Sequence, residues 1–282
     1  LVRSALRTNR KILLQKTKKV SCFHSKILLK FVCMIAEIKS KNRQFKVDLS
    51  QPLDISIPLR TGKENVSAWY VDPIKIEPVR TEQFTGSVEE GGSVNFRDIS
   101  FNPHGNGTHT ECVGHISEKV HSINQNLKQF FFLAELISIE PKILSNGDKI
   151  ITVEQVSAAR KNKDAEAIVI RTLPNDREKK NKQYSNTNPP YIEKEAVKEL
   201  INSGIDHLLI DLPSVDREMD DGVLAAHHTF WEYPENPQMH RTITELIYVA
   251  DDIKDGEYLL NIQIAPFEND ASPSKPTLYS II

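Results

Sequence analysis

Residues 103–115 hold the densest group of side chains able to do chemistry in this sequence of 282 residues. The stretch reads PHGNGTHTECVGH and contains three of the nine histidines, His104, His109 and His115, together with the carboxylate of Glu111. Divalent first-row metals readily accept imidazole and carboxylate ligands. His109 and Glu111 are two residues apart, so both side chains point the same way if the backbone is extended. The stretch therefore predicts a metal site, although histidines on a polar loop are also typical of a solvated surface.

The same stretch resembles the signature of a family of metal-dependent cyclases and hydrolases that includes bacterial kynurenine formamidase and isatin hydrolase. The family pattern is Pro-His-x-Gly-Thr-His-x-Asp-x-Pro-x-His. Here Pro103-His104 and Gly107-Thr108-His109 match it, with one extra residue between them. Glu111 stands where the family has Asp, and residues 112–114 replace the usual run before the last histidine. The resemblance extends from about Asp48 to the C-terminus.

Two later segments continue the resemblance. Residues 211–216, DLPSVD, resemble the family's Asp-x-Pro-Ser-x-Asp segment, which shapes the site beside the metals. A ligand histidine then precedes an apolar pair, here Phe230-Trp231, which places this ligand at His227 and leaves His228 as the alternative. Glu245 lies in an otherwise apolar strand-like run, where a carboxylate is costly unless it is paired or coordinated. It matches the family's last ligand.

The resemblance implies a site for two divalent metal ions. His104, His109 and Glu111 would hold one ion, and Glu111 would be shared with a second ion held by His227 and Glu245. Zinc suits such nitrogen and oxygen ligands best, and manganese is the alternative. Two ions of this kind would bind a water between them, acidify it and polarise a carbonyl oxygen.

Other residues near this motif have an implied role or an open one. His115 matches the family's catalytic imidazole and would carry the proton to the leaving nitrogen. Trp69 lies where the family has a tryptophan in the substrate pocket, and would stack on a planar substrate or serve as an ordinary core aromatic. Cys112 is a further candidate as a soft ligand or nucleophile. Arg171 is interpreted as a structural hydrogen-bonding residue.

We therefore expect a metal-dependent hydrolase acting on a small-molecule amide, with N-formylkynurenine, a metabolite of tryptophan catabolism, as the best candidate substrate. A related alternative is the opening of a cyclic imide or an isatin-like ring. Because Glu111 and Cys112 depart from the pattern, a catalytically silent metal-binding scaffold on the same fold is a third hypothesis. The resemblance also implies a homo-oligomer, either a dimer or a tetramer.

Composition excludes several other classes of protein. The formal net charge of -2 argues against a nucleic-acid binder, since such domains usually carry a strong basic excess. The sequence has no run of 18 apolar residues, so we expect no membrane-spanning helix. The three cysteines, Cys22, Cys33 and Cys112, show no paired spacing, which favours a reducing compartment and predicts a cytoplasmic protein.

The first 33 residues differ from the rest of the sequence. They contain nine Lys or Arg residues and no Asp or Glu. Such a segment is typical of an organelle transit peptide, and residues 27–36 faintly resemble the apolar core of a signal peptide. A third interpretation, which we favour, is an upstream extension of the reading frame, because the first methionine is Met34. We thus predict a basic extension, residues 1–33, outside the core and a hydrolase domain at residues 34–282.

Hydrophobic periodicity predicts an α/β fold with a mixed sheet, a single domain of the swivelling β/α/β type that the resemblance implies. Strands are expected at 45–50, 93–99, 130–139, 150–153, 165–172, 205–211 and 242–247. A short helix is expected from residue 116, and a longer one over 191–204, where apolar residues repeat at helical spacing before Gly204. Residues 174–190 are rich in Asn, Lys and Pro and predict a mobile loop. The helix followed by a strand at 205–211 predicts parallel pairing.

Overall fold

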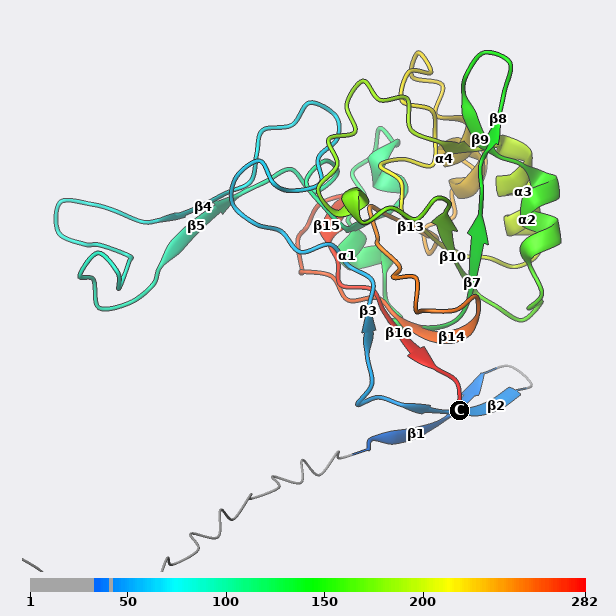
Figure 1. The fold of residues 1–282 in the computed structure, drawn as a ribbon, viewed down its shortest axis with the longest axis horizontal. Coiled ribbons are helices and arrows are strands. Elements are labelled where there is room, and N and C mark those ends of the chain that lie inside the picture. Colours follow the sequence, from blue (N-terminus) through cyan, green and yellow to red (C-terminus); the bar gives the residue numbers. More distant parts are fainter. Residues whose placement is uncertain (1–32, 41–42) are drawn as a thin grey trace, which may run out of the picture. The chain divides into compact units, whose positions relative to one another are not determined.

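The computed structural model describes residues 33–40 and 43–282. The hypotheses on residues 1–32 lie outside the described residues. From Cys33 onward the described chain forms one compact unit, built around a large sheet (Figure 1). None of the helices in this part of the chain combines the length and the apolar character that a bilayer crossing requires.

The main sheet has nine strands in the order β15-β6-β13-β12-β10-β7-β14-β16-β3. The strands are β3 (Leu53–Asp54), β6 (His109–Glu111), β7 (Phe131–Ile139), β10 (Ala167–Thr172), β12 (His207–Ile210), β13 (Thr242–Glu245), β14 (Gly256–Asn261), β15 (Ala271–Pro273) and β16 (Thr277–Ser280). The four central strands, β13, β12, β10 and β7, are parallel to one another, and the outer pairs are antiparallel. The sheet is therefore mixed, which confirms the predicted α/β fold class.

Three helices cover one face of this sheet: α2 (Val153–Ala159), α3 (Lys194–Asn202) and α4 (Ala225–Trp231). Alternation along β10 explains how both faces are filled. Ile168 and Ile170 pack with the helices, whereas Ala167 and Val169 join a second apolar cluster on the opposite face. That face is covered by connecting segments and by the one-turn helix α1 (Ile123–Asn126).

Smaller sheets and turns complete the described structure. They comprise the hairpin of β1 (Ile35–Ser40) with β2 (Arg43–Asp48), the hairpin of β4 (Lys75–Pro78) with β5 (Arg97–Ser100), the sheet of β8 (Lys142–Ile143), β9 (Lys149–Ile151) and β11 (Tyr191–Ile192), and the 3-10 turns η1 (Val113–His115) and η2 (Arg177–Lys180). The β4–β5 hairpin projects away from the main sheet (Figure 1).

Most of the expected strands are present, and the parallel pairing of the strand near 205–211 is confirmed by its register with β10. Three expectations were wrong. Residues 116–120 form turns instead of a helix. Val153 starts helix α2 instead of ending a strand, because Thr152 and Gln155 form a capping box. Tyr191 and Ile192 pair with β9 as a strand, so helix α3 starts only at Lys194.

Candidate metal centre

The candidate centre begins where β6 and β13 lie side by side. The two strands are antiparallel, and Glu245 pairs with His109 while Ile243 pairs with Glu111. Glu245 is the last residue of β13, because Leu246 turns the backbone into the left-handed region with φ 53°. All three polar side chains are fully or almost fully buried. Strand pairing thus places residues 109–111 next to the carboxylate of Glu245, which lies more than 130 positions later in the sequence.

Helix α4 brings a further imidazole to this place. Its first turn is held by Asp216, whose carboxylate accepts hydrogen bonds from the backbone N–H groups of Ala226 (2.7 Å) and His227 (3.0 Å). The same carboxylate accepts a third hydrogen bond, 2.6 Å long, from Nδ1 of His227. Nε2 of the same ring points toward Glu111 and lies 3.2 Å from its Oε1. Asp216 therefore fixes both the helix and the ring orientation.

Glu111 is the centre of the group. Its Oε2 lies 3.0 Å from Nδ1 of His104, 3.8 Å from Nε2 of His109 and 4.0 Å from Nδ1 of His115. Nε2 of His109 also lies 3.5 Å from Oε2 of Glu245. Four imidazoles and the carboxylate of Glu245, from three distant segments, therefore converge around Glu111, which is fully buried.

Two buried atoms in this group lack hydrogen-bond partners among the described residues: Nε2 of His109 and Oε2 of Glu111. His109 donates its Nδ1–H to the carbonyl oxygen of Gly107 at 2.9 Å, so its Nε2 carries a lone pair. Burying two such atoms without a well-formed hydrogen bond is costly, and buried polar atoms normally have one. A divalent cation accepts both kinds of donor atom, so these residues fit a metal ion.

The donor atoms fall into two groups able to hold an ion. One contains His104, Glu111 and His115, and the other contains His109, Glu111 and Glu245. The expected division put His104 with His109, and His227 with Glu245. Glu111 is common to both arrangements. His227 stays next to the second group, with its Nε2 3.8 Å from Oε1 of Glu245.

Asp270 joins the centre and was not predicted as a site residue. Its Oδ2 accepts a 2.8 Å hydrogen bond from Nε2 of His104 and lies 3.5 Å from Nδ1 of His115. The residue directly precedes β15, the strand that pairs with β6. The sequence places Asp270 in the C-terminal segment covered by the family resemblance, and this was the only signal available for it.

The charges of these groups shift each other's pKa values. Burial lowers the pKa of His104, but its hydrogen bond to Asp270 and its contact with the Glu111 carboxylate raise it to about 10. Burial likewise opposes protonation of His227, while hydrogen bonds to Asp216 and Glu111 raise its pKa to about 10. Burial raises the pKa of Glu111, yet the charge of His115, the contact with His104 and the hydrogen bond from His227 hold it well below its usual range. The carboxylates thus create a negative potential that favours cations.

A cavity of about 350 Å³ opens onto the centre. Its wall includes Trp69, His104, His115, His227 and Glu245. The ring of His115 stacks on that of His104, with centroids 4.3 Å apart, and its side chain remains 31% exposed. Trp69 is half-buried in a left-handed backbone conformation at φ 59°. An imidazole and an aromatic ring therefore face the space next to the buried donors.

Other candidates lie outside the cavity. His228 donates from Nδ1 to the carbonyl oxygen of Tyr233, just beyond helix α4, at 3.0 Å, and lines a groove between α3 and α4. Cys112 is buried, donates from Sγ to the carbonyl oxygen of His121, and has a pKa raised by burial. Arg171 donates to Asp255 and to two backbone carbonyl oxygens, which is a structural arrangement as predicted.

Comparisons with known proteins agree with this fold. The Cyclase family model, described as "Putative cyclase", matches residues 47–217. The kynurenine formamidases of Bacillus cereus and Bacillus anthracis are 26% and 25% identical to this chain; the matches cover 82% and 83% of it, and 99% and 97% of those proteins.

Among solved structures, isatin hydrolase A from Labrenzia aggregata gives a TM-score of 0.60 at 15% identity, covering 82% of this chain and 94% of that one. A structure described as a potential metal-dependent hydrolase with cyclase activity gives a TM-score of 0.56 at 16% identity, covering 82% and 98%. The resemblance read from residues 103–115 is thereby confirmed. Because the family model spans more than half of the 282 residues, the chain belongs to the cyclase family.

Proposed function

We propose that this chain is a metal-dependent hydrolase of a small-molecule amide, with an aryl formamide such as N-formylkynurenine as the substrate class. The observation that carries the proposal is the pair of buried, unpartnered donor atoms, Nε2 of His109 and Oε2 of Glu111, beside a cavity of about 350 Å³. The kynurenine formamidases, whose matches to this chain span nearly their own full length, support this choice of substrate.

The proposed ligands are His104, His109, Glu111, His227 and Glu245, with Glu111 shared between two ions. When bound, two divalent cations supply Lewis acidity that polarises a carbonyl oxygen and lowers the pKa of a water. Zinc is the preferred metal for this nitrogen and oxygen donor set, and manganese is the alternative.

The chain's own residues position and protonate the substrate. Asp216 and the Gly107 carbonyl oxygen each hold one nitrogen of a ligand histidine, so that the other nitrogen faces the centre. Trp69 lines the cavity, where its ring would stack on a planar substrate. His115 would hold a proton and deliver it to the leaving nitrogen, with Asp270 near its Nδ1 stabilising the charged ring.

Several finer properties belong to the same proposal. We infer that the protein is cytoplasmic, since its cysteines show no disulfide pattern and the two cysteines of the described residues are free. The family resemblance favours a homo-oligomer, a dimer or a tetramer. We also propose that residues 34–282 form the hydrolase domain and that residues 1–33 lie outside its core.

The direct test is formate release from N-formylkynurenine. The protein is stripped with a chelator, reloaded with Zn²⁺ or Mn²⁺, and compared with the stripped form. We expect release only from the loaded protein. Isatin is assayed in parallel, because ring opening without formate release would identify the alternative substrate. Loaded protein that retains its metal and turns over neither compound would support the silent scaffold and overturn the hydrolase.

Glu257→Gln is a suitable control variant. Glu257 forms a surface ion pair with Arg43, and the pair lies on strands β14 and β2 instead of in the candidate cavity. Glu257→Gln changes the net charge of the protein by the same amount as Glu111→Gln. A loss of metal or activity that appears only in Glu111→Gln therefore cannot be attributed to the change in net charge.

A further inference from the structure

A second cavity lies at the carboxyl edge of the main sheet, and none of its lining residues belongs to the cavity of the candidate metal centre. Its volume is about 640 Å³. Glu140 follows β7, Thr172 ends β10 and Leu212 follows β12, so three adjacent parallel strands direct their carboxyl ends toward it. This edge is the usual place for ligands in open α/β sheets.

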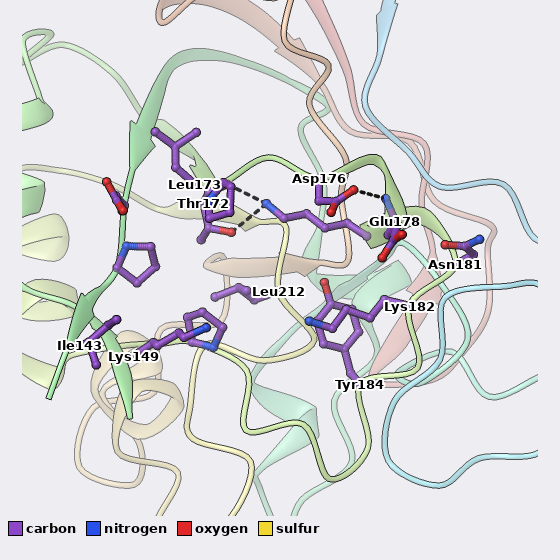
Figure 2. A pocket seen from close by; sticks show the side chains of 15 residues that line it. Ile143, Lys149, Thr172, Leu173, Asp176, Glu178, Asn181, Lys182, Tyr184 and Leu212 are labelled. Carbon is purple, nitrogen blue, oxygen red and sulfur yellow. Dashed lines mark hydrogen bonds between the residues drawn. The ribbon is translucent and has the colours of Figure 1, made fainter. Parts of the chain in front are cut away.

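Much of the lining is apolar. The apolar residues are Pro141, Ile143, Leu173, Pro174, Tyr184, Pro190 and Leu212. Ile143 and Leu173 are large apolar side chains that remain 68% and 38% exposed. Figure 2 shows the Tyr184 ring beside Leu212, with its hydroxyl group directed into the pocket. The volume and the apolar walls suit a small organic molecule.

The ammonium group of one lysine in this cavity is held by hydrogen bonds to neighbouring parts of the fold. The ammonium group of Lys179 donates to the carbonyl oxygen of Thr172 at 2.6 Å and to Oδ2 of Asp211 at 2.8 Å (Figure 2 shows the bonds at Thr172). Asp211 is fully buried and also accepts hydrogen bonds from Thr172. This network ties the loop after β10 to the sheet edge, so Lys179 is part of the wall.

Two other lysines of this cavity, Lys149 and Lys182, have ammonium groups that could bind a ligand. Lys149 and Lys182 extend into the pocket from opposite sides (Figure 2), and Nζ of Lys182 lies 4.9 Å from the centroid of the Tyr184 ring. Within residues 33–40 and 43–282, neither ammonium group forms an ion pair with a carboxylate at 4.0 Å or less. Two ammonium groups that lack ion-pair partners and lie next to apolar side chains form a favourable binding site for an anion.

Acidic residues also line this cavity, and they limit the charge that it accepts. Asp176 and Glu178 lie together at one end, where Asp176 accepts a hydrogen bond from the backbone N–H of Glu178. Burial lowers the pKa of Lys182, and the charges of Lys149 and Lys179 lower it further, against the opposing effect of these two acids. The cavity lining holds three acids, Glu140, Asp176 and Glu178, and three lysines. Because Lys179 is paired with Asp211, the ammonium groups of Lys149 and Lys182 are the ones that face the cavity without an ion-pair partner among the described residues.

We propose that this cavity binds a small organic anion, with a carboxylate or phosphate group between Lys149 and Lys182 and an apolar body against Tyr184 and Leu212. The nearby Asp176 and Glu178 disfavour ligands that carry several negative charges. This site is separate from the candidate metal centre and does not depend on the function proposed for that centre.

The test is isothermal titration of the metal-loaded protein with benzoate, phenyl phosphate and the neutral analogue benzamide. The variant K149M/K182M removes both charges and keeps apolar side chains of similar length. The control K39M/K46M makes the same change in net charge at two exposed lysines of the β1–β2 hairpin. The Glu111→Gln variant separates this binding from binding at the metal centre.

We expect wild type, K39M/K46M and Glu111→Gln to bind benzoate or phenyl phosphate equally well, and benzamide to bind more weakly. Whichever of the two anions binds more tightly identifies the head group. In K149M/K182M the affinity should fall by about tenfold or more, as for the loss of two exposed charge pairs. Unchanged affinity in K149M/K182M, equal binding of benzamide, or no binding of any probe to the wild type would overturn the proposal.

Discussion

Nε2 of His227 lies 3.2 Å from Oε1 of Glu111, although 116 positions separate the two residues in the sequence. The contact joins helix α4 to strand β6, and both side chains are buried. Because Asp216 holds the other nitrogen of the same ring, His227 has little freedom to turn away. This arrangement underlies the first two predictions.

Glu111→Gln should abolish metal retention. Glutamine has nearly the same shape, but it removes the charge and one acceptor oxygen from the group that contacts four histidines. We expect metal affinity to fall by at least about a hundredfold, more than for the loss of a residue that only orients a ligand. Metal content is measured by mass spectrometry after dialysis, with Glu257→Gln as the control. Full metal content in Glu111→Gln would contradict the assignment.

Asp216→Asn should weaken metal binding without unfolding helix α4. Oδ1 of Asp216 accepts from the backbone N–H of Ala226, and Oδ2 accepts both from the backbone N–H and from Nδ1 of His227. An asparagine whose oxygen takes the place of Oδ1 keeps the bond to Ala226, whereas its NH₂ group cannot accept the two hydrogen bonds from His227. Loss of a residue that orients a metal-binding histidine usually lowers metal affinity by about 10- to 100-fold. Competition with a chelating dye measures the affinity, and circular dichroism checks the helix. Unaltered affinity would show that Asp216 serves the fold alone.

His115→Ala should separate catalysis from metal binding. His115 borders the cavity and is partly exposed, while the other histidines near Glu111 are more buried. If it transfers a proton, kcat on N-formylkynurenine should fall by about a hundredfold to ten-thousandfold with the metal retained. Metal content and kcat are measured on the same sample. Loss of one ion together with activity would instead make His115 a ligand, as its grouping with His104 and Glu111 allows.

Acid should destabilise the fold through His207, which lies away from the metal centre. This residue is 6% exposed, contacts the ring of Phe132 at a tilt of 38° and has a 2.9 Å hydrogen bond with Thr242. Burial lowers its pKa to about 4; nearby His240 lowers it further and Asp206 acts in the opposite direction. Between pH 6.5 and 4 the unfolded chain binds a proton that the folded chain does not, so stability falls as the pH decreases.

From pH 7 to pH 5 this effect amounts to about 2 kcal/mol in the free energy of unfolding. Urea unfolding at the two pH values measures it, and the difference between wild type and His207→Gln isolates the contribution of this residue. The matched control is His240→Gln, because His240 is exposed and close by. An equal pH dependence in wild type and His207→Gln would contradict the assignment to His207.

The sequence predicted the parts of the centre whose signal is local. His104, His109, Glu111 and His115 fall in thirteen consecutive residues, and their types alone indicated metal chemistry. Glu245 was detectable because a carboxylate in an apolar strand requires a partner. Asp270 carries no such local signal, and only the pairing of β15 with β6 brings it to His104. The division of the ligands into two groups depends equally on this tertiary arrangement.

The errors in the predicted elements have the same origin. Ile150, Ile151 and Val153 predict one strand, but Thr152 and Gln155 form a capping box that ends the strand and starts helix α2. Tyr191 and Ile192 continue the apolar pattern of helix α3, but their pairing with β9 is a non-local contact that overrides local preference. Long buried strands such as β7 and β10 were predicted well, because a continuous apolar run reflects burial on both faces.

An anomalous-scattering map of crystals of the metal-loaded protein tests the central claim most directly. The account predicts ion density bounded by Nε2 of His109, the carboxylates of Glu111 and Glu245, and Nε2 of His227, with a second ion that also shares Glu111. Data on both sides of the zinc and manganese absorption edges would identify the metal. If the protein holds metal in solution but the map shows ion density only elsewhere, or no ion density next to these donor atoms, the assignment of the metal ligands would be contradicted.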